Sequence, residues 1–168
     1  MDSAQVKCIL SYICANSGSK GRCFFDVFDC QQLDHVKITK YPALLIVNTM
    51  AAPMDGHWCA FFIPHKRGAL EFFDAFDQDP AMYNDEFVRF IARYGGYVQM
   101  PRAIQCLDAG SCGPHCLRYL YNRLKGETLY RIYLYVFKPG CRKNDQTSYE
   151  FVQNIIQKFP IKYRKLYF

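Results

Sequence analysis

Apolar residues in the first half of the chain follow a helical spacing and then strand patterns. The helical spacing lies near the N-terminus and comprises Val6, Ile9, Leu10 and Ile13. It predicts a helix that Ser3 caps and that ends before Asn16. Residues 42–49, PALLIVNT, are a short apolar run typical of a strand covered on both faces. Two further runs, WCAFFIP (58–64) and ALEFFD (69–74), flank a charged turn and predict a β-hairpin.

Glycines and apolar spacing divide the second half into helices and one more strand. A helix starts at Asp79, whose carboxylate can cap the free amides, and ends at glycines 95–96, before the strand candidate YVQM. From Cys112 or Gly113 another helix runs to Lys125. The segment ETLYRIYLYVF fits a strand or a helix, and QTSYEFVQNIIQKF is a final amphipathic helix.

These elements predict a single α+β domain over residues 1–168, with a central mixed or antiparallel β-sheet flanked by helices. A chain of 168 residues is long enough to bury a core without disulfides or metal ions. No apolar run approaches the roughly 20 residues that cross a bilayer, and the N-terminal MDSAQVKC lacks the regions of a signal peptide. We therefore expect a soluble, unsecreted protein.

The nine cysteines are odd in number and include no CxxC pair. They are Cys8, Cys14, Cys23, Cys30, Cys59, Cys106, Cys112, Cys116 and Cys141. Without a secretory signal, this pattern favours reduced thiols over a disulfide framework, most of them acting as small buried apolar residues. Because paired ligands at zinc spacing are missing, we expect no metal site.

The net charge of +6 is concentrated in the C-terminal third. Residues 1–117 carry 10 Lys and Arg against 12 Asp and Glu, whereas residues 118–168 carry 11 against 3, a local net charge of +8. Such polarity suits the attraction of a polyanion, and a solvated basic face explains it equally well.

The stretch QCLDAGSCGPHC, residues 105–116, holds the most promising candidate for chemistry. Cys112 stands at the start of a predicted helix, where free amides and the helix dipole favour thiolate over thiol. Gly113 lets the backbone come close to a substrate, and Pro114 fits the first turn. The position suits a nucleophile, and a buried apolar cysteine is the alternative.

A nucleophilic thiol needs a general base, and the chain offers four histidines. His57 lies at the turn that opens a strand, so its ring can face a cleft and reach a helix N-terminus. His115 shares a helix with Cys112, but its ring would project away from a shared cleft. His65 lies in a charged turn, and His35 has no distinguishing context.

The base needs an orienting acid. Asp74 ends the strand that pairs with the strand after His57, so the two can lie side by side in the hairpin. Glu71 and Asp77 fit less well, because Glu71 begins that strand and Asp77 lies beyond it.

Amide cleavage also requires donors aimed at the developing oxyanion. Gln105 offers a side-chain NH2, and the backbone amide of Cys112 is the second candidate donor. Each element alone is a weak signal, but the order His, acid, Gln, Cys is specific as a set.

Together these residues resemble the adenovirus-type cysteine proteases, the adenain family, whose clan also holds the SUMO- and NEDD8-specific proteases. The matching pieces are IVNT (46–49), GHW (56–58), FFDAF (72–76), Gln105 seven residues before Cys112, and SCGPHC (111–116). FFDVFD (24–29) also resembles the family's aromatic segment ahead of its first core strand. The interval from Gln105 to Cys112 suits the adenoviral branch better than the SUMO-protease branch, and papain-type enzymes place the cysteine first.

The resemblance implies an adenain-like fold with the catalytic cysteine at a helix N-terminus. It implies that Cys112 is the nucleophile, His57 the general base and acid, and Asp74 the orienting acid. Gln105 and the amide of Cys112 would form the oxyanion hole. Adenain-like enzymes have Glu where Asp74 stands, whereas Asp occurs in the SUMO-protease branch.

The resemblance also has implications for cofactors. The proposed chemistry itself requires no cofactor. The peptide activator of the adenoviral enzyme forms a disulfide with an upstream cysteine, and the corresponding stretch around Tyr94 has none, so covalent peptide activation is not expected. DNA is a second cofactor of that enzyme, and the basic C-terminal third keeps DNA activation open. Arg118, Arg123 and Lys125, with the terminal IKYRK, are the candidate phosphate contacts.

We interpret the chain as a cysteine endopeptidase that matures capsid and core precursors of a DNA virus or virus-like element. It would act in the virion and host nucleus, on viral precursor polypeptides, with no membrane partner and as a monomer. One alternative is an isopeptidase for ubiquitin-like modifiers, from the same clan. The other is a non-catalytic basic DNA-binding virion protein on the same fold.

Overall fold

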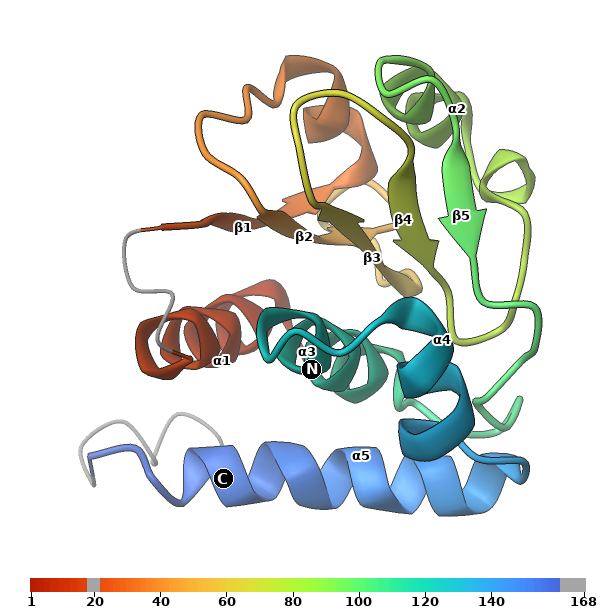
Figure 1. Cartoon of the computed structure of the whole chain (residues 1–168). Helices are drawn as coiled ribbons and strands as arrows, with labels where there is room; N and C mark the ends of the chain where they lie inside the picture. Colours follow the sequence, from red (N-terminus) through yellow and green to blue (C-terminus); the bar gives the residue numbers. More distant parts are fainter. Residues whose placement is uncertain (18–21, 161–168) are drawn as a thin grey trace.

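A five-stranded sheet forms the centre of the computed structural model, which describes residues 1–17 and 22–160 (Figure 1). The strands, in their order across the sheet, are β1 (Phe24–Asp29), β2 (Ala43–Asn48), β3 (Trp58–Ile63), β4 (Leu70–Phe73) and β5 (Tyr97–Gln99). β2 and β4 each pair antiparallel with β3, which lies between them, while β1 and β5 lie parallel to their neighbours β2 and β4. The predicted α+β class with a mixed sheet is confirmed.

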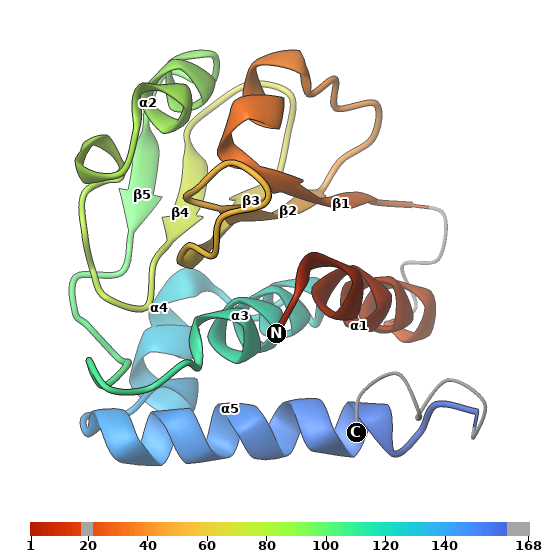
Figure 2. The ribbon, with the colours of Figure 1, turned by 180° about the vertical axis from the view of Figure 1, so that it is seen from behind.

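Helices form two layers on one face of the sheet and a thinner cover on the other. The helices are α1 (Ser3–Asn16), α2 (Asp85–Ala92), α3 (Cys112–Leu124), the short α4 (Leu129–Arg131) and α5 (Cys141–Ile156). α1 and α3 lie between the sheet and α5, as both views of the ribbon show (Figures 1 and 2). α2 and the 3-10 helix η1 (Cys30–His35) cover the opposite face.

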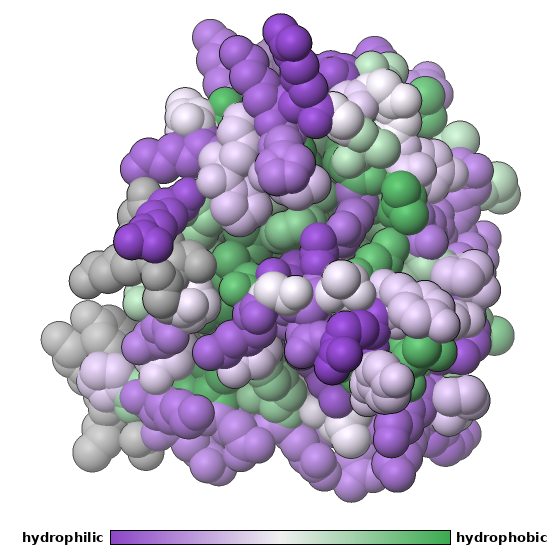
Figure 3. Space-filling view, viewed as in Figure 1, coloured by the Kyte–Doolittle hydropathy of each residue, from purple (hydrophilic) through white to green (hydrophobic). Residues whose placement is uncertain are grey.

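The central strands are buried on both faces, as the apolar runs predict. In β2, Leu44 and Ile46 face the core under α1 and α3, whereas Leu45 and Val47 face the core under α2. This alternation follows from the two-residue period of a strand. Apolar side chains show in the band between the sheet and the helices below it, with polar side chains over the outer surface of α5 (Figure 3).

The hairpin predicted from the runs at 58–64 and 69–74 is present, with Phe61 opposite Phe72 in the register of β3 and β4. Residues 24–29, expected ahead of the first core strand, are themselves the edge strand β1. The ambiguous segment 127–137 is helical, comprising α4 and a π-helical turn at Ile132–Val136.

Several helix starts differ from the sequence expectations because other side chains reach the free amides. α1 is capped by Asp2 rather than Ser3, since the Asp2 carboxylate accepts a hydrogen bond from Gln5 N at 2.8 Å in a capping box. Asp79 caps only a 3-10 turn, Pro80–Met82. Asn84 caps α2. None of the helices in the two described ranges has the length and apolar character that a bilayer span requires.

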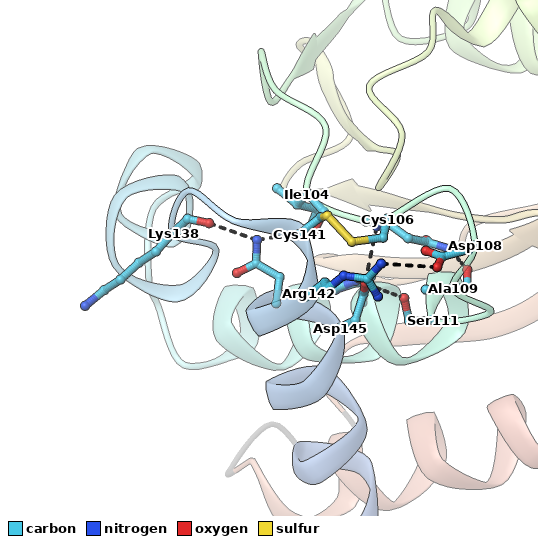
Figure 4. Close-up of a disulfide and its surroundings, with 12 residues drawn as sticks. Ile104, Cys106, Asp108, Ala109, Ser111, Lys138, Cys141, Arg142 and Asp145 are labelled. Atoms are coloured by element: carbon cyan, nitrogen blue, oxygen red, sulfur yellow. Dashed lines mark hydrogen bonds and ion pairs between the residues drawn. A yellow bond between two sulfur atoms is a disulfide. The ribbon is translucent and has the colours of Figure 1, made fainter.

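One disulfide, between Cys106 and Cys141, contradicts the expectation of reduced thiols throughout (Figure 4). It joins residues 35 apart in sequence and ties the loop before α3 to the first residue of α5. The other described cysteines form no disulfide, and five of them, Cys14, Cys23, Cys30, Cys59 and Cys116, are buried. Their expected role as small core residues is therefore confirmed.

α5 begins at the disulfide-bonded Cys141, five residues before the expected start at Gln146. The polar residues Asn144 and Asp145 in its first turns are buried and bonded to the loop before α3. A pattern of apolar positions alone cannot detect a helical turn whose inward face is polar.

Candidate active site

The ends of β3 and β4 and the start of α3 bring His57, Asp74 and Cys112 together. His57 directly precedes β3, and Asp74 directly follows β4, so antiparallel pairing places the two side by side. His57 Nε2 lies 2.5 Å from Asp74 Oδ1. The His57 ring also lies close enough to the side chain of Cys112, the first residue of α3, for each group to shift the pKa of the other. Since Nε2 faces Asp74, Nδ1 is the ring nitrogen left for the sulfur.

Asp74 is a buried carboxylate whose oxygens are fully used. Besides His57, it accepts hydrogen bonds from Phe76 N at 3.0 Å, Gln78 N at 2.8 Å and the Tyr83 hydroxyl at 2.7 Å. Burial raises the pKa of Asp74, but the hydrogen bond and charge of His57, with the other donors, outweigh it and lower the pKa. Asp74 is therefore ionised and fixed in orientation.

His57 is held by the end of β2 and by neighbouring rings. Its backbone N donates to Thr49 Oγ1 at 2.9 Å, and Thr49 N donates to its carbonyl oxygen at 2.9 Å. The imidazole stacks on Phe76, with ring centroids 4.7 Å apart. A Cβ at position 56 would lie 2.2 Å from Asn48 Oδ1, so only glycine lets the loop before His57 approach β2 this closely.

The protonation states of His57 and Cys112 favour an ion pair. Burial lowers the pKa of His57, but hydrogen bonds and charge interactions with Asp74 and Cys112 raise it to about 9. Burial raises the pKa of Cys112, but His57 and the backbone amides of Trp58 and Gly113 lower it below that of an ordinary thiol. Both shifts favour the pair of thiolate and imidazolium over the neutral pair.

The helix that carries Cys112 keeps its first amides open. Ser111, in the N-cap position of α3, forms no capping hydrogen bond, and its hydroxyl donates to Asp145. Pro114 in the first turn has no N–H. The amide of Cys112 therefore points from an uncapped helix end, the arrangement that binds anions at helix N-termini.

Gln105 is buried in the loop that leads to α3 and is tied to the strand end that carries Asp74. Its backbone N donates to Ala75 O at 3.1 Å, and its Nε2 donates to Ala109 O. Its Oε1 is buried and has no hydrogen-bond partner among the described residues. One Nε2 hydrogen remains for another acceptor, as an oxyanion donor requires.

Replacing Gln105 with alanine is expected to lower kcat by about 10²-fold, because one transition-state hydrogen bond is lost. Gln105→Glu keeps the shape but removes the N–H donor, so it should lose at least as much. The measurement is steady-state peptide cleavage for both variants beside the wild-type protein. A wild-type kcat in either variant would remove Gln105 from the site.

A groove of about 780 Å³ opens at Cys112. Gly56 and Trp58 form one part of its lining, and Gly110 borders it beside the sulfur. The rest comes from the start of α1, the end of β1 with η1, and residues 48–55. An extended peptide passing along this groove would bring a carbonyl carbon to the thiolate.

The competing histidines and acids lie elsewhere or have other partners. His115 is fully buried and bonded to Asp145 and Ser148, away from the groove, while His35 and His65 are exposed. Glu71 accepts a hydrogen bond from Tyr119 and pairs with Arg123. Asp77 accepts from Gln99.

Two of the three residues predicted to contact phosphate, Arg118 and Arg123 on α3, have hydrogen-bond or ion-pair partners inside the protein. Arg118 donates to Thr147 Oγ1 at 2.6 Å, and Arg123 pairs with Glu71 at 2.8 Å. Lys125 is exposed. The terminal IKYRK lies outside the described residues. Charge counts missed this because they do not tell which guanidinium groups have internal partners.

His57, Cys59 and Asp74 are the described residues that could hold a metal ion, since their ligand atoms all lie within 4.8 Å of one another. An ion there would compete with the hydrogen bond between His57 and Asp74. The donor set thus serves a triad more readily than a metal centre.

No protein-family model matches the sequence, and a search of curated proteins finds no match either. Among solved structures, the chain is similar to the ASFV pS273R protease, with a TM-score of 0.63 and 14% identity. The alignment covers 92% of this chain and 66% of that protease, so the chain spans just under two thirds of its length. The selenomethionine form of that protease gives a TM-score of 0.62, 13% identity, and coverage of 92% and 67%.

The chain has the fold of this clan of cysteine proteases. The adenain-like fold predicted from the sequence is thereby confirmed. The SUMO protease Ulp1, in a structure with its catalytic cysteine oxidized to a sulfinic acid, aligns at a TM-score of 0.49 and 10% identity over 92% of this chain and 78% of Ulp1.

Sequence reasoning did not identify three supporting residues of the site. Thr49 accepts a hydrogen bond from the backbone of His57. Tyr83 donates a hydrogen bond to the carboxylate of Asp74. Asp145 accepts a hydrogen bond from the loop before α3. Thr49 lies in a motif that the resemblance singled out, so a signal existed for it. Tyr83 and Asp145 lie in segments without a motif.

Proposed function

We propose that the chain is a cysteine endopeptidase that cleaves capsid and core precursor proteins of a DNA virus or virus-like element during maturation. The observation that carries the proposal is the juxtaposition of Cys112, His57 and Asp74, with His57 bonded to Asp74, at an uncapped helix N-terminus beside a groove. The viral origin of the pS273R protease, on the same fold, supports the viral setting. The proposed place of action is the virion and host nucleus.

The first half of the proposed reaction forms an acyl-enzyme. The Cys112 thiolate attacks the carbonyl carbon of the scissile peptide bond, and the carbonyl oxygen becomes an oxyanion. The amide of Cys112 and Nε2 of Gln105 donate hydrogen bonds to that oxyanion. The C–N bond then breaks while the His57 imidazolium gives its proton to the leaving amine, which leaves a thioester on Cys112 and a neutral imidazole.

The second half releases the acid and restores the ion pair. Neutral His57 takes a proton from a water molecule, whose oxygen attacks the thioester carbonyl. The C–S bond breaks, the carboxylic acid leaves, and thiolate and imidazolium are regenerated. Asp74 stays ionised throughout and holds the ring with Nε2 toward itself, so that Nδ1 faces the sulfur.

Cleavage of ubiquitin-like modifiers is a second candidate, favoured by the presence of Asp at position 74 where adenain-like enzymes have Glu. The deciding experiment incubates the protein with viral precursor polypeptides and, separately, with SUMO and ubiquitin probes that trap the active cysteine. We expect precursor cleavage, seen by mass spectrometry, and no probe adduct. Adducts without precursor cleavage would favour the second candidate. If neither precursor cleavage nor an adduct were seen, both candidates would be contradicted.

The proposal retains DNA as an activator because residues 118–168 carry a net charge of +8. Lys125 is one of the basic residues in this segment that are exposed. The precursor assay should therefore be run with and without DNA, at low and high salt, because phosphate contacts weaken steeply with salt. Equal rates in all four conditions would remove DNA from the proposal. A basic virion protein without catalysis would show DNA binding and no cleavage.

A further inference from the structure

The first turns of α5 contact the oxyanion loop, residues 104–111, through three side chains on one face of the helix. Cys141 forms the disulfide with Cys106. Asn144 Nδ2 donates to Ile104 O at 3.3 Å. Asp145 Oδ2 accepts from Cys106 N at 3.2 Å. Positions 141, 144 and 145 share a face because helical residues three and four apart are neighbours. Figure 4 shows Cys141 and Asp145 turned toward the loop.

Asp145 also reaches the other end of the same loop. Its Oδ1 accepts a hydrogen bond from the Ser111 hydroxyl at 2.5 Å. Cys106 follows Gln105, and Ser111 precedes Cys112, so one buried carboxylate joins the neighbours of both proposed oxyanion donors. The loop between these two residues contains a turn, in which Ala109 N donates to Cys106 O at 3.0 Å.

The bond to Ser111 has a second consequence for the helix end. A serine in the N-cap position normally accepts a hydrogen bond from an amide of the first turn. Here the hydroxyl is committed to Asp145, and no side-chain cap forms on α3. The contact with Asp145 therefore fixes the orientation of Ser111, the residue directly before the amide of Cys112.

His115 supplies the third donor to Asp145. Its Nε2 lies 2.9 Å from Asp145 Oδ1, and the Ser148 hydroxyl lies 2.9 Å from its Nδ1. Burial lowers the pKa of His115, so the ring is neutral, donates from Nε2 and accepts from Ser148 at Nδ1. The carboxylate thus receives three donors, and nothing in this cluster contacts the groove.

We propose that Asp145 is a positioning residue of the oxyanion hole, which it holds through Cys106 and Ser111 without touching the substrate. The proposal rests on the proposed peptidase function. It makes the start of α5 part of the catalytic apparatus, with the disulfide and Asn144 as supporting contacts.

The test is Asp145→Asn, which keeps the shape of the side chain but removes one acceptor oxygen, so one of the three donors loses its partner. We expect kcat for peptide cleavage to fall about 10-fold or more, with KM within about twofold, because the loosened donors act in the transition state. Alkylation of Cys112 by iodoacetamide should stay within about twofold of wild type, since it needs the thiolate but no oxyanion hole.

Asp108→Asn is the matched control. Asp108 lies in the same loop, but its side chain is 68% exposed and its partner is the exposed Arg142 at 3.4 Å. We expect kcat, KM and alkylation to match the wild-type protein. A wild-type kcat in Asp145→Asn would overturn the proposal. Equal losses of cleavage and alkylation would also overturn it, because they would show a general structural role.

Hydrogen exchange separates this proposal from the proposed function. Exchange across residues 104–111 should rise in Asp145→Asn whether or not a peptide substrate is found, and unchanged exchange would contradict positioning. Failure of the wild-type protein to cleave any peptide would instead contradict the peptidase function. Should Asp145→Asn not fold, Ser111→Ala removes one contact and is expected to lower kcat about fivefold, with alkylation retained. An unchanged kcat in that folded variant would reject the proposal.

Discussion

Replacement of Cys112 with alanine is expected to abolish peptide cleavage, a loss of about 10⁴-fold or more in kcat. The reason is that neither the oxyanion donors nor the imidazole can form an acyl-enzyme without the sulfur. The side chain is partly exposed at the groove, and its loss leaves no large cavity, so we expect the thermal midpoint of unfolding and any DNA binding to be retained. Cleavage rates and thermal unfolding are measured on the same preparations.

Cys8→Ala is the control for Cys112→Ala, because Cys8 is another free and partly exposed cysteine, on α1. It should cleave peptides at the wild-type rate. Wild-type turnover in Cys112→Ala would reject the assignment of the nucleophile, and loss of turnover in Cys8→Ala would point to a general sensitivity to cysteine replacement.

The Asp74→Asn variant is expected to lose on the order of 10³-fold in kcat. Three other donors, Phe76 N, Gln78 N and the Tyr83 hydroxyl, still compete for the remaining side-chain oxygen. The new amide would therefore turn an N–H toward Nε2 of His57. Two N–H groups cannot face each other, so the His57 tautomer with hydrogen on Nε2 would be disfavoured. The pKa of His57, now about 9, would fall, and the descending limb of kcat/KM against pH would move to lower pH.

Asp77→Asn is the matched control for that variant. Asp77 lies in the same turn, with φ of 59°, a backbone conformation that asparagine also adopts. Its carboxylate bonds Gln99 at 3.2 Å rather than His57. We expect near wild-type cleavage and an unchanged pH profile. A wild-type profile in Asp74→Asn, or equal defects in both variants, would remove Asp74 from the site.

Local patterns predict much of what builds the site. The apolar runs of β2, β3 and β4 define the hairpin, and antiparallel pairing then places His57 beside Asp74 without further information. The spacing after Cys112 predicts α3, which begins at that residue. These features depend on neighbours within a few residues or on one hairpin.

Features that depend on distant partners could not be predicted. Cys106 and Cys141 pair across 35 residues, and neither carries a local signal for the other. The start of α5 was missed because Asp145 is a buried polar residue, which a pattern of apolar positions assigns to the surface. The internal partners of Arg118 and Arg123, which are Thr147 and Glu71, could not be predicted from the charge pattern.

The ion pair between Cys112 and His57 is tested most directly by the pH dependence of Cys112 alkylation, in wild type and in His57→Ala. Because His57 lowers the pKa of Cys112, the wild-type thiolate should persist as the pH falls below about 8.5, the ordinary thiol value, and disappear only on passing its lowered pKa. Without His57, only the backbone amides of Trp58 and Gly113 oppose the effect of burial, which raises the pKa of Cys112, so alkylation should require a more alkaline pH. Superimposable curves for the two proteins, both with a midpoint near about 8.5, would contradict the account.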